Sequence, residues 1–234
     1  VRVHPIRGSE KAFEYRNKVE LSFGPRRFLS ETAHARGEAI DGRFMGFHAS
    51  GRFDRIADVN RCHLVDEGMA VLHQVIRRHV LERSMAPLWD SRAHEGFWRH
   101  VLLRRGEATG QYIVGLYTTS EALYETEVRA LAEQLMATDL GASARVNGVV
   151  WLINDGVADV ARGDVREVWG VPVIEEILLG KRFELAIPSF FQTSTSGASV
   201  LYETIREAVG GHFRRLYDLY CGTGSIGIAL SDSA

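Results

Sequence analysis

Apolar and polar residues alternate along several short segments of the chain, and this alternation predicts half-buried strands. Other segments carry the short apolar runs and bordering turn residues that are typical of strands. The predicted strands and strand-rich segments are 14–24, 37–55, 97–104, 111–118, 149–153 and 181–186. The first of them places Val19, Leu21 and Phe23 on one face. The third and fourth flank a glycine-containing turn and predict a hairpin.

Three further segments carry apolar residues at helical spacing. The predicted helices cover 68–82, 120–136 and 198–209. Ser120 has the residue type and the position of an N-cap for the second helix. Asn147-Gly148 and residues 154–156 are turn signals that bracket the predicted strand at 149–153.

The order of the elements changes near residue 187. Residues 1–186 predict a mixed α+β domain, whereas residues 187–234 predict helix, strand (215–220), glycine loop and helix, which is how a parallel domain begins. The expected fold class is therefore α/β: a central α+β domain followed by the first βα unit of a Rossmann-like domain. A parallel sheet needs several such units, so we expect the chain to be a fragment whose segment after residue 187 is loosely held.

The composition is that of an ordinary globular protein, with 45% hydrophobic and 25% charged residues. The net charge is −2, but residues 1–110 hold 19 Lys+Arg against 14 Asp+Glu, which leaves 9 against 16 for the remainder. A basic front half could face a polyanion, although modest imbalances are also common. Two cysteines exclude a disulfide framework, and no apolar run reaches the roughly 20 residues of a membrane span. We therefore expect a cytoplasmic protein with no membrane partner.

The strongest motif is DLYCGTGSIG at residues 218–227. Gly222 and Gly224 allow the backbone to turn sharply at the end of a predicted strand and to approach a ligand closely. The spacing of the three glycines also satisfies the dinucleotide fingerprint. The motif alone leaves three readings open, namely a nucleotide-type cofactor such as S-adenosylmethionine, NAD, or a glycine-rich turn without a ligand.

A second motif, SFFQTST at residues 189–195, precedes a predicted helix. Its Ser and Thr residues are good helix caps, and taken alone this explanation is favoured. Gln192 is less easily explained by capping, because its side-chain amide can both donate and accept hydrogen bonds to a ligand.

Five blocks, in the same order along the chain, resemble the RNA uracil-5 methyltransferases. They are EYRNKVELSFG (14–24), GFHASGRFDRIADVNRCHL (46–64), LRRGEATGQYIVGLYT (103–118), SFFQTST (189–195) and LYDLYCGTGSIGIALS (216–231). The FFQ motif followed by D-x-Y-C-G-x-G is specific to this family and favours S-adenosylmethionine over NAD. The resemblance implies a monomeric enzyme that methylates carbon 5 of a uridine in rRNA or tRNA, so RNA is the implied partner.

The resemblance also assigns residues. Positions that match the family's cofactor-binding residues are Gln192, Asp218, Tyr220, Gly222, Gly224 and Ser225. Ser225 stands where many relatives have Asn, which weakens its assignment. Arg16 and Asn17 belong to a family-like YRN block and are expected to be structural or to face RNA.

Two departures from the family matter. Its nucleophile is a Cys in a Pro-Pro-containing motif and its base is a Glu, and neither segment occurs in these 234 residues. No catalytic residue is therefore assigned, and we expect the chain alone to be inactive. Cys221 belongs to the glycine loop and is expected to pack as a small apolar residue. Many relatives hold a [4Fe–4S] cluster with four cysteines, of which only Cys62 is matched, so it is either an orphaned ligand or a buried inert thiol.

Two other classes of protein remain as alternatives: a non-catalytic RNA-binding module and an NAD-binding oxidoreductase. His94-Glu95 with His100 resembles a zinc motif, but an i,i+6 spacing would place the two histidines on different faces of a helix. Core packing rather than stacking on RNA is expected of the nearby aromatic residues Trp89, Phe97 and Trp98.

Overall fold

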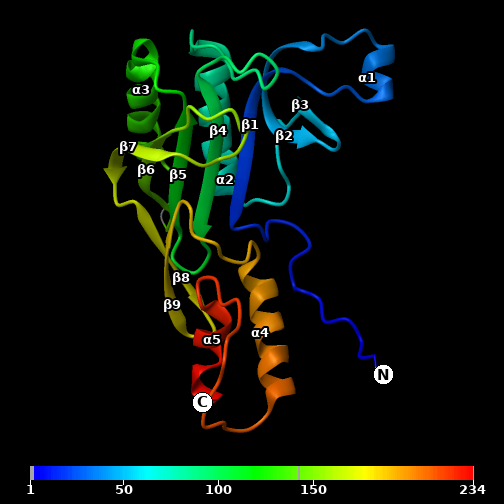
Figure 1. Ribbon diagram of the computed structural model, residues 1–234, viewed down its shortest axis with the longest axis vertical. Coiled ribbons are helices and arrows are strands. Elements are labelled where there is room, and N and C mark those ends of the chain that lie inside the picture. The colour runs from blue at the N-terminus through cyan, green and yellow to red at the C-terminus, as the bar shows by residue number, and fades with distance from the viewer. Residues whose placement is uncertain (1–2, 142, 234) are drawn as a thin grey trace.

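A seven-stranded mixed sheet organises most of the molecule (Figure 1). The structure is a computed structural model that describes residues 3–141 and 143–233. The strands are β1 (Lys18–Arg26), β2 (Asp41–Ala49), β3 (Arg52–Asp58), β4 (Trp98–Gly106), β5 (Gln111–Thr118), β6 (Arg145–Ile153) and β7 (Asp164–Gly170). They lie in the order β3-β2-β1-β4-β5-β6-β7, and every neighbouring pair is antiparallel except β5 and β6.

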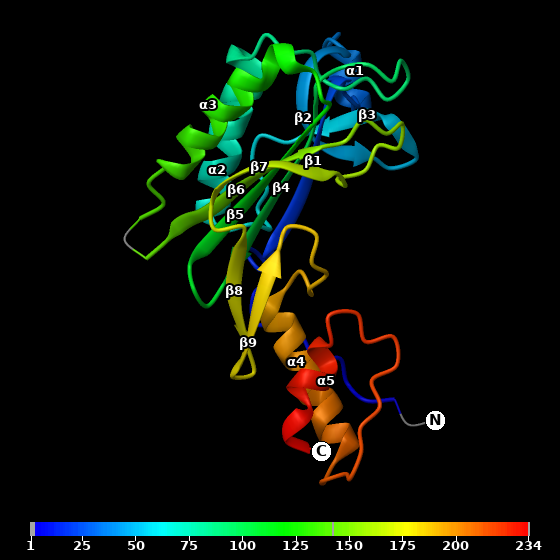
Figure 2. The same cartoon turned by 60° about the vertical axis from the view of Figure 1, so that its left-hand side comes forward.

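Two helices, α2 (Glu67–Arg77) and α3 (Glu125–Met136), cover one face of this sheet (Figure 2). α2 begins where the Asp66 carboxylate accepts a hydrogen bond from the Met69 amide at 3.1 Å, and it ends in a π-helical turn at Arg78–Arg83. α3 forms the crossover between the parallel strands β5 and β6. The helix residues in this first core include Met69, Leu72, Ile76, Val80, Val128, Leu131 and Leu135.

The alternation in β1 sets which side chains face the helices. Val19, Leu21 and Phe23 belong to the first core, each 3% exposed or less. Lys18, which precedes Val19, and Glu20, which follows it, point to the opposite face of the sheet. The expected strand at 14–24 is therefore confirmed, although it begins at Lys18.

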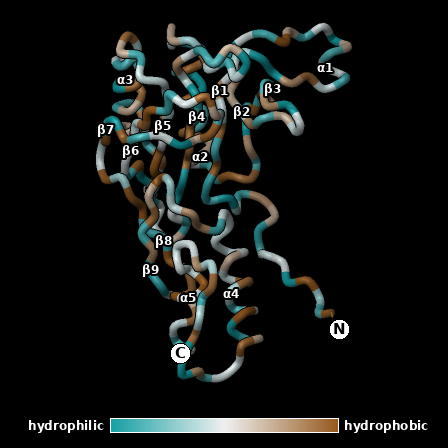
Figure 3. Tube along the Cα trace, viewed as in Figure 1, coloured by the Kyte–Doolittle hydropathy of each residue, from teal (hydrophilic) through white to brown (hydrophobic). Residues whose placement is uncertain are grey.

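The opposite face of the sheet carries a second core. A hairpin of β8 (Val173–Leu178) and β9 (Lys181–Ala186) packs on it through β8, and α4 (Thr195–Val209) and the short α5 (Ser225–Ala229) extend the same core beside the hairpin. We call residues 173–233 the second lobe, and it lies at one end of the sheet in Figure 1. Figure 3 shows hydrophobic and hydrophilic residues alternating along α4. The buried members of the second core from this lobe include Ile174, Phe183, Leu185, Phe191, Ala198, Tyr202 and Ala229.

These contacts correct the expectation that everything after residue 187 is loosely held. α4 and α5 are seated in a core, because Ala198, Tyr202 and Ala229 are each 4% exposed or less. The expected boundary at 186–187 falls inside this shared core, since β8 and β9 pack with the helices that follow them. The division into two domains at that position remains a prediction.

Three local predictions are wrong. Residues 215–220 form no strand, because none of the described strands pairs with them and an isolated strand leaves its backbone groups unpaired. Ser120 does not cap α3, since its amide donates to Asp155 and a 3-10 turn precedes the helix. Asn147-Gly148 lies inside β6, where the glycine lets the carbonyl of Val171 approach closely.

The remaining strand and helix predictions agree with the structure within a few residues. The hairpin of β4 and β5, the strands β6 and β9, and the helices α2, α3 and α4 are all confirmed. Three elements were not predicted, namely α1 (Glu31–Ala35), β7 and β8. β7 is an edge strand and mostly exposed, so its sequence has little reason to alternate. Among the described helices, none has both the length and the apolar character to cross a membrane.

Hydrogen exchange should separate the core from the exposed connection between α4 and α5. We expect the amides of 149–153, in β6, to exchange slowly, because this strand is paired on both sides, with β5 and β7. The amides of 211–220, which belong to no helix or strand, should exchange orders of magnitude faster. Mass spectrometry of peptides covering both segments measures this. Equal protection of the two segments would contradict the described packing.

Candidate cofactor site

The SFFQTST segment is fixed to the sheet by the side chain and backbone of Asn17. The Asn17 amide Nδ2 donates to the Gln192 carbonyl oxygen and to the Thr195 Oγ1, both at 2.9 Å. The Asn17 backbone N–H donates to the carbonyl oxygen of Thr193 at 2.8 Å. Asn17 is 3% exposed, and its bond to Thr195 is buried, whereas its bond to Gln192 is partly buried. The structural role expected of Asn17 is thereby supported, and it is specific to the segment that carries Gln192.

The Gln192 side chain is left available by this arrangement. Its backbone carbonyl is occupied by Asn17, but its side-chain amide makes no hydrogen bond to any residue that the structure describes. Gln192 is half-buried, with buried Phe191 on one side and exposed Thr193 on the other. A positioned, half-buried amide can donate to one ligand atom and accept from another.

The residue that caps α4 is not Gln192. Ser194 is the N-cap of α4, because its Oγ accepts from the Gly197 amide at 3.1 Å. Thr195 donates through Oγ1 to the carboxylate of Glu176 at 2.9 Å. The cap explanation is therefore correct for Ser194 and wrong for Thr195, and it leaves Gln192 unexplained.

Glu176 extends the same network to the turn between β4 and β5. Its side chain is fully buried, and it accepts from the amides of Glu107 at 2.9 Å and Ala108 at 3.2 Å. A buried carboxylate is tolerated when several donors satisfy it. Through Glu176, the start of α4 at Thr195 is therefore attached to the β4–β5 turn of the sheet.

Arg104 supports the turn before the motif. Its guanidinium donates to the carbonyl oxygens of Ala186, at 2.8 Å, and Ser189. Burial lowers the pKa of Arg104 to about 10, so it remains charged at neutral pH. Sequence reasoning missed both Arg104 and Glu176. A polar residue at an inward position of an otherwise alternating strand is the signal that could have found each.

The glycine loop is partly ordered by its own side chains. Asp218 accepts from the Gly227 amide through Oδ2 at 2.9 Å, which links the two ends of the motif. Ser225 begins α5, and its hydroxyl lies 2.8 Å from that of Tyr202 on α4. Ser225 is 7% exposed, so it is oriented toward the second core rather than toward the loop.

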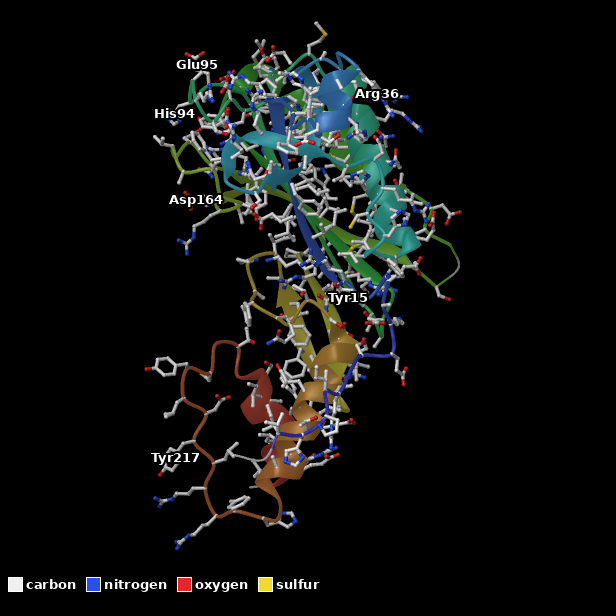
Figure 4. All side chains as sticks on the ribbon, turned by 90° about the vertical axis from the view of Figure 1, so that its right-hand side faces the viewer. Tyr15, Arg36, His94, Glu95, Asp164 and Tyr217 are labelled. Atoms are coloured by element: carbon white, nitrogen blue, oxygen red, sulfur yellow. The ribbon has the colours of Figure 1, made fainter. Side chains whose placement is uncertain are left out.

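The loop between these anchors is open to solvent. Gly222 and Gly224 have φ of 56° and 72°, a backbone conformation that favours glycine. Tyr220 also has a positive φ of 61°, and its side chain is fully exposed. Figure 4 shows the neighbouring Tyr217 pointing away from the ribbon.

The predicted cofactor residues thus fall into two groups within the second lobe. Gln192 lies immediately before α4, and residues 218–225 lie immediately before and within α5. Tyr202 of α4 joins them through Ser225. No hydrogen bond connects Gln192 to the loop among the described residues.

The other sequence candidates do not form a metal site. No group of three or more His, Cys, Asp or Glu residues suited to a metal ion occurs in the described part of the chain. Cys62 is partly buried against the first core, and Cys221 is exposed, contrary to its expected packing. His94 lies in a turn, with His100 in β4, so the two never share a helix. Trp89, Phe97 and Trp98 are all buried in the core, as expected.

The sequence and the fold were compared with those of known proteins. No protein-family model matches the chain. A curated RNA methyltransferase from Clostridium acetobutylicum, itself uncharacterized, is 32% identical over 98% of this chain and 47% of its own length. The tRNA (uracil(54)-C(5))-methyltransferase of Pyrococcus furiosus is 26% identical over 95% of this chain and 46% of its own.

The resemblance to RNA methyltransferases is confirmed. The chain is homologous to them along nearly its whole length, and it spans about half the length of the curated relatives it matches. The fold is shared with the crystal structure of the Pyrococcus abyssi tRNA (uracil-54, C5)-methyltransferase in complex with S-adenosyl-L-homocysteine. That comparison has a TM-score of 0.69 and 24% identity, over 96% of this chain and 48% of the other.

Replacing Asn17 by Ala should destabilise the fold, because it leaves the Thr195 hydroxyl and the Gln192 carbonyl short of a donor in a buried place. The expected loss is about 1–3 kcal/mol in the free energy of unfolding. Urea denaturation followed by tryptophan fluorescence measures it. Asn60→Ala, at an exposed position, is the matched control and should change stability little. Equal midpoints for the two variants would show that the Asn17 bonds contribute nothing.

Proposed function

We propose that this protein is an S-adenosylmethionine-dependent RNA methyltransferase that acts on carbon 5 of a uridine in tRNA or rRNA. Its homology to RNA methyltransferases over 98% of the chain supports the class. The more distant relatives from Pyrococcus, which are named for uracil-54 of tRNA, support the uridine carbon. The observation that carries the proposal is Gln192, whose backbone is held by Asn17 while its side-chain amide stays free.

The cofactor residues fit a ligand with both polar and apolar parts. S-adenosylmethionine would supply the methyl group on its sulfonium. Gln192 offers a donor and an acceptor, and the exposed ring of Tyr220 offers an apolar surface. Gly222 and Gly224 leave the loop without side chains at the two points where the backbone turns. Asp218 holds the loop closed through the Gly227 amide.

RNA is the proposed partner, and the finer expectations belong to the same proposal. The basic excess of residues 1–110 suits a polyanion, because Lys and Arg contacts to phosphate dominate affinity for nucleic acids. The proposal includes a monomer that acts in the cytoplasm, and two free cysteines suit a reducing compartment.

The described residues do not fit a [4Fe–4S] cluster. Such a cluster needs four cysteine thiolates. Cys62 packs against the first core, while Cys221 lies in the exposed glycine loop of the second lobe. The reading of Cys62 as a partly buried structural residue therefore suits its surroundings better than that of a ligand.

Gln192→Ala should weaken the binding of S-adenosylmethionine roughly tenfold, the equivalent of about 1.4 kcal/mol, because one polar contact is lost. Calorimetric titration of the protein at its full natural length measures this, with NAD titrated in parallel. Thr193→Ala is the matched control, since Thr193 is the exposed neighbour. Preferential binding of NAD, or unchanged affinity in Gln192→Ala, would contradict the proposed cofactor.

The 234-residue chain by itself should transfer no methyl group to RNA. Its two thiols match family positions that are not nucleophilic, and the Cys62 side chain is partly buried against the core. Incubation with methyl-labelled S-adenosylmethionine and uridine-containing RNA tests this. Turnover that disappears in Cys62→Ser or Cys221→Ser would show that one of these residues is the nucleophile after all.

A further inference from the structure

A pocket of about 530 Å³ lies on the face of the sheet that α2 and α3 leave uncovered. Its floor is apolar and includes Leu102, Val150 and Leu152, each 5% exposed or less. One wall is the loop after β6, at residues 161–163, and another is the segment after β9, at residues 186–188. Pockets of several hundred cubic ångströms with apolar floors and a few polar groups are typical of small-ligand sites.

The register of the strands gives the pocket two different ends. Lys18 on β1 pairs with Arg104 on β4, which places two cations in the same row of the sheet. Four residues further along β1, Ser22 pairs with His100, and His100 pairs with Tyr117 of β5. Four residues of a strand span about 14 Å, so a cationic end and a tyrosine end face one elongated space.

The cationic end carries an excess of positive charge, which the nearby carboxylate of Glu20 offsets only in part. Lys18 is half-buried and makes no ion pair with any residue that the structure describes. Burial and the charge of Arg104 lower the pKa of Lys18, because both disfavour its charged form. Arg162, exposed on the rim, also has no ion pair among the described residues, and Glu20 is the one carboxylate in the lining. An anion bound beside Lys18 would offset this excess of positive charge.

The opposite end of the pocket holds a tyrosine hydroxyl that makes no hydrogen bond to the described residues. This residue, Tyr117, is 1% exposed and lines the pocket. Burial and the charge of Glu20 raise the pKa of Tyr117, so the hydroxyl keeps its proton at neutral pH. Since Tyr117 lines the pocket, this hydroxyl is available to donate to an acceptor on a bound ligand.

The loop that forms one wall is held in place by hydrogen bonds to the sheet. Arg99, itself fully buried, donates to the carbonyl oxygens of Asn154 at 2.7 Å, Gly156 at 2.5 Å and Ala158 at 2.8 Å. In the same loop, Asp159 Oδ1 lies 2.9 Å from His100 Nε2. The wall is therefore fixed before any ligand arrives, which reduces the entropy lost on binding.

We propose that this pocket binds one unstacked nucleotide of the RNA substrate, distinct from the uridine that is methylated. The base would lie on the apolar floor with an acceptor toward the Tyr117 hydroxyl, and its phosphate would lie near Lys18. Proteins commonly read single-stranded RNA in this way, by holding splayed bases on apolar or aromatic surfaces. The inference rests on the proposed function for its source of nucleotides.

Titration of the 234-residue chain with uridine and adenosine monophosphates, followed by amide chemical shifts, tests the pocket. Ribose 5-phosphate and inorganic phosphate are the ligand controls. Lys18→Gln and Tyr117→Phe should each weaken nucleotide binding roughly fivefold, which is the loss of one polar contact. Val165→Trp should block the pocket without unfolding the protein, because Val165 is an exposed rim residue. Arg36→Gln, on the exposed end of α1 (Figure 4), is the matched control and should leave binding unchanged.

A short single-stranded RNA should displace the bound mononucleotide. Failure of RNA to compete, equal binding of inorganic phosphate, or insensitivity to both Lys18→Gln and Val165→Trp would overturn the proposal. If the protein at its full natural length neither bound S-adenosylmethionine nor transferred a methyl group to RNA, the proposed function would be contradicted instead. The two failures are therefore distinguishable.

Discussion

The placement of the SFFQTST segment depends on one buried amide, that of Asn17. Its side chain and backbone hold the carbonyl groups of Gln192 and Thr193 and the hydroxyl of Thr195. A side-chain amide of this length can reach a neighbouring segment and satisfy it without bringing in water. Together with Glu176, Arg104 and the second core, this attachment positions α4 relative to the sheet.

Much of the fold could be predicted from the sequence because its signals are local. The alternation of Val19, Leu21 and Phe23 and the helical spacing of 68–82 both follow from burial on one face, which a single segment records. The sequence missed β7 and wrongly predicted a strand at 215–220, and both errors have the same physical reason. A strand exists when another strand pairs with it, and pairing is a property of distant segments. β7 found a partner in β6 despite its weak pattern, whereas 215–220 has a strand-like pattern and no partner among the described strands.

The candidate site was predictable in its residues and not in its geometry. The types and spacing of Gln192 and of Asp218 to Gly224 are visible along the chain. The residues that fix them cannot be read from the sequence, because Asn17 and Arg104 act on backbone carbonyl oxygens and Glu176 accepts from backbone amides, and every residue type offers such groups. The unpaired charge of Lys18 and the unpartnered Tyr117 hydroxyl are likewise invisible until the strands are in register. Whether a side chain has a partner depends on which segments lie beside it in the fold, and the sequence alone does not give this.

The separation of 175 residues between Asn17 and Gln192 has a consequence for the order of folding. Contacts between segments so far apart can form only after the intervening chain has collapsed, because closing a long loop is entropically costly. During synthesis, the strand that follows Asn17 can pair with β2 and β4 long before residue 192 leaves the ribosome. The SFFQTST segment is then added to a sheet that already exists. The second lobe is therefore the last part of this chain to acquire its native position.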